Sequence, residues 1–283
     1  SGTLSVFLCM PGAGALLQSM EILTYLLTGA VAGLMAGLLG VGGGLVIVPA
    51  LAWLFATQGF DGASLMHFAV GTSLAVIVPT ALSSLFAHHR RGSVDWTTVK
   101  RLTPGIVLGA LAGAALARQL SSNGLAVFFG LFEIAVAVQL FIGAQPDGHR
   151  ALPGRFGMGV AGSVIGLVSA LLGIGGGTLT TPFLMWNGVD IRRAVGTSAT
   201  CGLPVALAGA AGFAIAGLDT PVQPGLNTGF IVWPAMAAIT LASVLLAPAG
   251  AALAHRLPRR VLQQVFAAFL LLVGGRMLWS SLY

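Results

Sequence analysis

Two glycine-rich stretches decide the fold, LLGVGGG at residues 38–44 and LLGIGGG at residues 171–177. Each lies in the middle of an apolar block, 22–56 or 156–187, that is too long for one membrane span of about 20 residues. A proline follows each stretch, and glycine and proline are poor helix formers. We therefore predict that each block forms two helical pieces around a non-helical break.

The chain repeats itself around these breaks. The glycine-rich stretches align at an offset of 133, the AVGTS segments 69–73 and 194–198 at 125, and the GAALA segments 113–117 and 250–254 at 137. We therefore predict an internal duplication. Its parts are an N-terminal extension (1–21), a first transmembrane repeat (22–143), a linker (144–155) and a second transmembrane repeat (156–283).

The composition indicates a membrane protein. Only 7% of the 283 residues are charged, 57% are hydrophobic, and the mean hydropathy is +0.97. Soluble domains carry about 25% charged residues, so lipid must face much of this protein. The apolar blocks are 22–56, 63–87, 102–120, 124–143, 156–187, 191–217, 229–254 and 260–281. This pattern predicts an all-α polytopic membrane protein.

Other functional classes find little support in the sequence. The net charge of +6 comes from 13 basic and 7 acidic residues, with no basic face for nucleic acid. Cys9 and Cys201 are too few for a disulfide framework, and their spacing does not suggest zinc. GxSxG, HExxH and paired carboxylates are absent, so we expect no enzyme, no metal and no cofactor.

The basic residues predict the orientation through the positive-inside rule. A cytoplasmic placement of the basic loops collects 11 of the 13 Lys and Arg residues, if both ends of block 156–187 emerge on one side. The two pieces of that block then form a hairpin. If block 22–56 behaves likewise, each half has about five helical pieces, and an odd number turns the second half upside down. We predict an inverted repeat with its amino terminus outside. The two histidines and two arginines at 88–91 are expected to fix this topology.

The paired breaks are the predicted substrate site. Inverted repeats with broken helices are typical of secondary transporters, with the site near the midplane. A helix that begins after GVGGG or GIGGG presents unpaired N–H groups and the positive end of its dipole, which favours an anion. Hydroxyls of the AVGTS segments can add hydrogen bonds. The predicted substrate-binding residues are Gly42, Gly43, Gly44, Thr72, Ser73, Gly175, Gly176, Gly177, Thr178, Thr197 and Ser198.

The two halves of this site differ in their hydroxyls. Thr180 and Thr181 add donors in the second half, where the first half has Ile47 and Val48. The site is therefore expected to be only pseudo-symmetric. A structural interpretation stays open beside it, because glycine also serves close helix packing and membrane hydroxyls often bond their own backbone.

The same residues resemble a known family. LLGVGGG with Pro49, its copy LLGIGGG with Pro182, and the two AVGTS segments are similar to the TauE/SafE sulfite exporter family, over essentially residues 22–281. The resemblance implies a multi-pass carrier in the bacterial cytoplasmic membrane. It also implies that the substrate is sulfite, a sulfonate such as sulfoacetate, or a related sulfur oxyanion.

Four ionisable residues are candidates for gating or coupling. Glu133 is the only carboxylate deep in an apolar run, and it either couples export to proton entry or is a protonated residue at a helix interface. Arg276 either attracts anions or snorkels toward a helix end. His67 and Arg192 each lie five residues before the threonine of a GTS triplet. In an inverted repeat they lie at opposite mouths of the substrate site, where they either recruit anions or face solvent and lipid headgroups.

We expect export of sulfite, sulfoacetate or a related anion by alternating access. The expected partners are this small anion and the lipid bilayer, with proton coupling and a homo-oligomer left open. The alternative is an anion channel, or an importer of another small anion or carboxylate.

Overall fold

The computed structural model describes residues 13–39, 43–142, 151–221, 223–254 and 259–282. Within this part of the chain there are ten helices and one two-stranded hairpin. Eight of the helices are long and apolar enough to cross a membrane. The prediction of an all-α polytopic membrane protein is confirmed.

The helices follow the predicted apolar blocks closely, except that α2 begins at Ala13, inside the predicted N-terminal extension. The first half contains α2 (Ala13–Leu39), α3 (Gly44–Thr57), α4 (Leu65–Arg90), α5 (Trp96–Ala117) and α6 (Ser122–Ile142). The second half contains α7 (Arg155–Leu172), α8 (Gly177–Trp186), α9 (Ile191–Ala216), α10 (Trp233–Ala254) and α11 (Arg259–Leu282). The hairpin of β1 (Asn227–Thr228) and β2 (Ile231–Val232), which precedes α10, was not predicted.

Both long blocks are interrupted at their glycines. After α7, Gly173 has a φ of +64°, a left-handed conformation that glycine adopts without steric cost. In the first half α2 ends at Leu39 and α3 begins at Gly44, and residues 40–42 between them lie outside the described residues. With 14 and 10 residues, α3 and α8 are too short to span a bilayer alone, as expected for the second arm of a hairpin.

The sequence repeat has a counterpart in the packing. α10 packs along α2 as α5 packs along α7, so each repeat helps to bury the other. In both pairs, glycines bring the backbones too close together for any side chain at those positions. The equivalent approaches are Gly29 to Ile239 and Gly162 to Leu102, Gly33 to Ser243 and Gly166 to Ile106, and Gly250 to Leu34 and Gly113 to Leu167.

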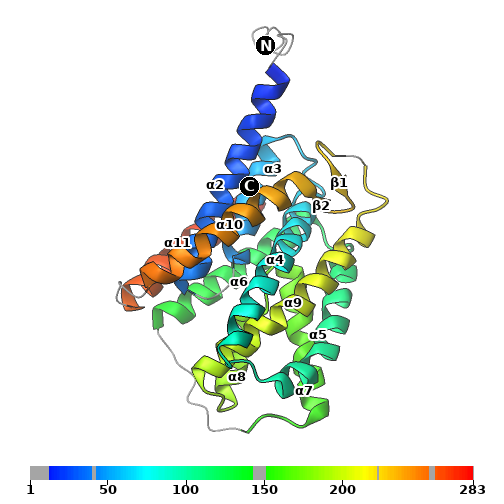
Figure 1. Cartoon of the computed structure of the whole chain (residues 1–283). Helices are drawn as coiled ribbons and strands as arrows, with labels where there is room; N and C mark the ends of the chain where they lie inside the picture. The colour runs from blue at the N-terminus through cyan, green and yellow to red at the C-terminus, as the bar shows by residue number, and fades with distance from the viewer. Residues whose placement is uncertain (1–12, 40–42, 143–150, 222, 255–258, 283) are drawn as a thin grey trace.

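Equivalent helices of the two halves run antiparallel. Along α4 and α9, Leu74 lies against Gly209, and Ala81 lies near Gly202, so the numbering rises on one helix as it falls on the other. Likewise α6 and α11 meet antiparallel near Gly130 and Gly274. Figure 1 shows α4 and α9 in the centre, α5 and α7 on one side, and α2, α10, α6 and α11 on the other. The arrangement is in keeping with the predicted inversion, and its orientation in a bilayer stays a prediction.

Basic residues gather at one end of the molecule, which we call the basic end. α9 begins where α4 ends, since the two helices are antiparallel, and α7 begins beside the start of α5. The basic end carries Arg90, Arg91, Lys100, Arg101, Arg155, Arg192, Arg193 and Arg260. Arg118 lies at the opposite end, in an exposed ion pair of 3.1 Å with Asp219. This distribution satisfies the positive-inside rule when the basic end is cytoplasmic.

Aromatic side chains close the opposite end, which we call the aromatic end. The cluster consists of Phe55, Phe60, Phe68, Phe213 and Phe230, all buried, with neighbouring ring centroids 4.5 to 6.3 Å apart. Phe230 comes from the turn of the hairpin and contacts both Phe68 at the start of α4 and Phe213 near the end of α9. Stacked and edge-to-face rings of this kind exclude water and add packing energy.

Candidate functional site

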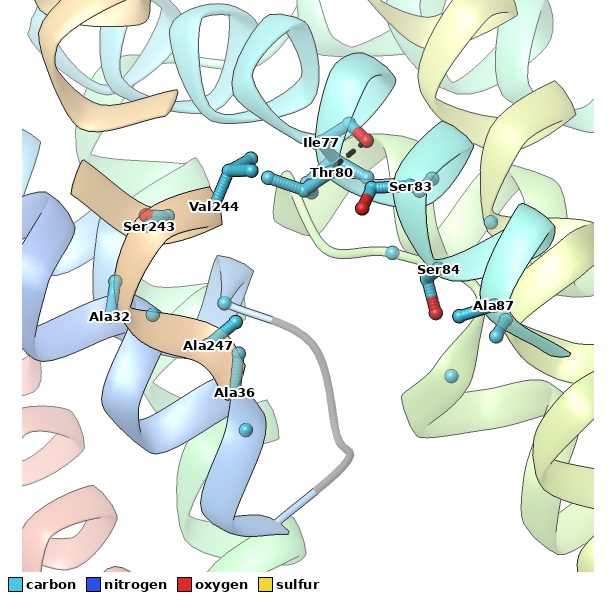
Figure 2. A pocket seen from close by; sticks show the side chains of 18 of the residues that line it. Ala32, Ala36, Ile77, Thr80, Ser83, Ser84, Ala87, Ser243, Val244 and Ala247 are labelled. Atoms are coloured by element: carbon cyan, nitrogen blue, oxygen red, sulfur yellow. Dashed lines mark hydrogen bonds between the residues drawn. The ribbon is translucent and has the colours of Figure 1, made fainter. Parts of the chain in front are cut away.

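A cavity of about 440 Å³ is lined by helices of both halves. Parts of α2 and α10 form one wall, and α4 with α8 and α9 forms the other (Figure 2). Both glycine-rich breaks border it, through Gly43 in the first half and through Gly175, Gly176 and Gly177 in the second. The structure thus brings together most of the glycines that the sequence predicted, while Gly42 lies outside the described residues.

The two breaks touch each other beside the cavity. Gly44 is buried against Gly173, where an added Cβ would lie 2.6 Å from the Gly173 carbonyl oxygen. The hydroxyl of Ser73 donates a hydrogen bond of 2.7 Å to the same oxygen. Since α3 and α8 both begin here, their unpaired N–H groups and positive dipole ends raise the potential at the cavity floor.

The second half of α4 supplies a polar wall. Thr80, Ser83, Ser84, His88 and Arg91 line the cavity from its floor to the basic end, and Figure 2 shows the first three on this wall. This wall was not predicted from the sequence. A spacing of three to four residues between hydroxyl and basic side chains within an apolar block was the available signal.

The mouth of the cavity is cationic. Arg91 is exposed there and has no ion-pair partner among the described side chains. His88 is held by a contact of 3.0 Å between its Nδ1 and the Ser93 hydroxyl. Among the described residues, no carboxylate lines this cavity. An anion that approaches from the basic end therefore meets positive charge first.

The threonines of the AVGTS segments hold backbone groups and do not line the cavity. Thr72 Oγ1 accepts a hydrogen bond of 3.0 Å from the N–H of Val232, and Thr197 Oγ1 accepts one of 3.0 Å from the N–H of Asp95. Both threonines are fully buried. They tie the chain that enters α10 to α4, and the chain that enters α5 to α9.

The remaining predicted hydroxyls lie at the edge of the site. Ser198 shares a hydrogen bond of 2.7 Å with Thr181 and donates to the Val195 carbonyl. Thr178 is half-buried in the first turn of α8, next to the cavity glycines. These side chains support the floor of the cavity, which Val195 lines directly.

None of the four predicted gating or coupling residues lines the cavity. His67 and Arg192 lie at opposite ends, but only Arg192 is exposed, at the basic end. His67 is buried at the aromatic end, where its Nε2 lies 2.9 Å from the Ala117 carbonyl oxygen and its ring lies beside Phe230. Glu133 is fully buried where α6 meets α11, and Arg276 is exposed on α11.

Asp95 fixes the start of α5 at the basic end. Burial would raise the pKa of its carboxyl, but hydrogen bonds from the Thr98 hydroxyl and from the N–H groups of Thr98 and Thr97 outweigh burial and lower that pKa below its usual 3.8. This carboxylate caps α5 while its own N–H is bound by Thr197. The loop behind the mouth is thereby fixed to both α5 and α9.

Comparison with known proteins identifies the family. The sequence profile of the sulfite exporter TauE/SafE family matches residues 25–277, which include both breaks and both AVGTS segments. The chain belongs to the TauE/SafE family. It is therefore a multi-pass membrane transporter, and the resemblance noted from the glycine motifs is confirmed.

Proteins similar to this chain carry the same general description. A probable membrane transporter protein of Haemophilus influenzae is 35% identical over 258 residues, which cover 90% of this chain and 97% of the relative. A probable membrane transporter protein of Bacillus subtilis, YunE, is 32% identical over 59% of this chain and 68% of its own length. A third, from Methanocaldococcus jannaschii, is 30% identical over 61% of this chain and 65% of its own length. No solved structure matches the chain.

Proposed function

We propose that this TauE/SafE protein exports sulfite, sulfoacetate or a related small anion across the bacterial cytoplasmic membrane by alternating access. The observation that carries the proposal is the cavity that both glycine-rich breaks border, which has Arg91 at its mouth and no acidic side chain among the described residues of its lining. A pocket of about 440 Å³ has room for a hydrated inorganic oxyanion or for a small organic sulfonate.

The electrostatics of the cavity support an anion as substrate. The N-terminal ends of α3 and α8 supply main-chain N–H groups and positive dipole ends at the floor. Ser83 and Ser84 add hydroxyl donors along the wall, and Arg91 adds a full charge at the mouth. A cation would meet no compensating negative side chain among these residues.

The closure at one end favours a carrier over a channel. The cavity reaches the basic end, while the buried aromatic rings occupy the opposite end. A channel would need a continuous path past Phe213 and Phe230, whose ring centroids are 6.3 Å apart. A carrier needs one closed end in each state.

Glu133 is proposed as the proton-coupling residue. Both of its carboxyl oxygens are buried without a hydrogen-bond partner among the described residues. It lies beside Gly274, at the contact between two equivalent helices of the repeats. A movement between the halves would change the surroundings of this carboxyl, which is what coupling requires.

Flux across the membrane of proteoliposomes tests the proposed function. Vesicles loaded with sulfite, sulfoacetate, sulfate or chloride should show saturable flux for sulfite or sulfoacetate and less for the other two anions. A pH gradient should drive this flux uphill if the carrier is proton-coupled. Absence of flux for both sulfite and sulfoacetate would contradict the proposal. Non-saturable flux of chloride would favour the channel.

A further inference from the structure

The cavity has a closed counterpart in the repeat. Each cavity residue of α4 has a counterpart 125 positions later on α9, and each cavity residue of α9 has one 125 positions earlier on α4. Each cavity residue of α2 has a counterpart 133 positions later on α7. The paired backbone approaches of α2 to α10 and of α7 to α5 show that this mapping also holds in space. The counterpart region therefore lies among α4, α5, α7 and α9, toward the aromatic end.

Burial separates the two regions. Three cavity residues are at least partly exposed, whereas their counterparts are fully buried. The pairs are Ala36 and Ser169, Ala199 and Leu74, and His88 and Phe213. Leu74 packs against Gly209, which is the counterpart of the cavity residue Ser84. Side chains such as Leu74 thus fill the counterpart region, where the equivalent space in the other repeat is the open cavity.

Two hydroxyls inside the closed region have no partner. Ser169 on α7 and Thr180 on α8 are fully buried, and neither oxygen has a hydrogen-bond partner among the described residues. Their counterparts, Ala36 and Ile47, line the cavity. An unpaired buried hydroxyl costs stability, so its presence calls for a physical reason. Contact with water or with an anion in another state supplies that reason.

Phe213 and Phe230 form the barrier over this region. Phe213 on α9 is the counterpart of His88, which borders the mouth of the cavity. Phe230 lies against Phe213 and Phe68, and its hairpin is held to α4 by the bond from Val232 to Thr72.

We infer that the closed region is a second vestibule, which opens at the aromatic end in the alternate state and presents the Ser169 and Thr180 hydroxyls to the anion. This inference rests on the proposed transport function and names the second half of its path. Phe213 and Phe230 are the gate of this vestibule, as Arg91 and His88 border the mouth of the first. Because the two sides have different linings, the anion meets the Arg91 cation on one side and the Ser169 and Thr180 hydroxyls on the other.

Cysteine accessibility tests the second vestibule. In a background with Cys9→Ala and Cys201→Ala, Ser169→Cys is the reporter and its counterpart Ala36→Cys is the control. A charged, membrane-impermeant thiol reagent is applied to right-side-out and to inside-out vesicles, with and without a sulfite gradient. We expect Ala36→Cys to be modified from the basic end. Ser169→Cys should be modified from the aromatic end, at a rate that the gradient changes.

A gate variant makes the test independent of substrate. Phe213→Ala should increase modification of Ser169→Cys from the aromatic end by about fivefold or more, since it weakens the closed state. Phe129→Ala removes an equally buried ring on α6, away from the gate, and should leave that rate unchanged. Thr180→Cys provides a second reporter should Ser169→Cys fold poorly.

The outcomes separate this inference from the proposed substrate. Modification of both reporters from the basic end would overturn the second vestibule. So would a Ser169→Cys protein that carries sulfite yet stays unmodified from the aromatic end. If the wild type carries no sulfite while Ser169→Cys reacts from the aromatic end, the vestibule stands and only the proposed substrate fails.

Ser169→Ala supplies a readout that a purely structural residue would not give. Removal of an unpaired buried hydroxyl should leave the melting temperature unchanged or raise it. The KM for sulfite presented at the aromatic end should rise about threefold or more, with no change for sulfite presented at the basic end. An unchanged KM from both sides would overturn the role of this hydroxyl.

Discussion

The hydroxyl of Thr72 accepts the backbone N–H of Val232 at 3.0 Å, and this bond holds the gate hairpin against α4. At the equivalent place in the other repeat, Thr197 accepts the N–H of Asp95. In each case the glycine before the threonine allows the same loop to approach: Gly71 lies against Phe230 and Gly196 against Ser93. The GTS triplets therefore connect each loop to the helix of the other half.

Thr72→Val should reduce folding stability without reducing the affinity of the folded protein for anion. The buried N–H of Val232 would lose its partner, at a cost of about 1–3 kcal/mol. Thr197→Val should cost less, because Asp95 is only half-buried and water can replace the hydroxyl. Thermal unfolding in detergent and sulfite binding measure the two quantities. A large loss of affinity with normal stability would restore Thr72 as a ligand, and Thr72→Ser serves as the control.

Arg91→Gln should weaken transport more than Arg90→Gln. Both arginines are exposed at the basic end, but only Arg91 lines the cavity. We expect a rise of about tenfold in KM for Arg91→Gln at low salt, since the cation concentrates anions at the mouth. The difference should shrink at high ionic strength, because salt screens exposed charges. Equal effects of the two variants would mean that these arginines act on topology alone.

Gly175→Ala and Gly173→Ala should separate binding from folding. An added Cβ at Gly175 would lie 3.6 Å from Ile77, an ordinary contact, so this variant should fold normally. Its methyl group would stand at the cavity floor and should raise KM about tenfold, or about 1.4 kcal/mol. Gly173 has a φ of +64° and would place its Cβ 2.8 Å from Val48, so Gly173→Ala should lower the melting temperature. Gly62→Ala, with open space around it, is the control.

Asp95→Ala should destabilise the protein by about 1 kcal/mol through loss of the α5 cap. The pKa of the folded carboxyl lies below its usual 3.8, so the contribution of its ionisation is present above that pH. It is lost as the pH falls through the lower, folded-state pKa. The gap in melting temperature between wild type and variant should therefore stay constant from about pH 8 to about pH 5 and narrow only in stronger acid. If the difference in melting temperature already narrows near neutral pH, another ionisable group causes the pH dependence.

Glu133→Gln should keep anion flux but remove its dependence on a pH gradient. Glutamine has the same shape as the carboxylic acid and cannot release a proton. Flux driven by a sulfite gradient and flux driven by a pH gradient, measured in the same vesicles, give the comparison. Glu21→Gln, on an exposed position of α2, is the control. A pH-driven flux equal to that of the wild type would leave Glu133 with a structural role.

Local chemistry explains why so much of the fold could be predicted. The lengths of the apolar blocks predicted the spanning helices, and the glycine triplets predicted where two of these helices break. The predicted glycines lie at one cavity because the two breaks occupy equivalent positions in the two repeats and meet where the repeats pack together. The polar wall on α4 could not be predicted with the same weight, since a serine in an apolar helix usually bonds its own backbone.

The chain by itself determined the number of spans, the duplication and the breaks, because membrane-length hydropathy and the conformational preferences of glycine act locally. Tertiary structure decided what each polar side chain does. Thr72 and Thr197 accept hydrogen bonds from loop backbones, and His67 lies beside Phe230. Ser169 and Thr180 have no hydrogen-bond partner among the described residues. These roles depend on which segment of the other repeat packs beside each residue, and that packing involves contacts between positions more than a hundred residues apart.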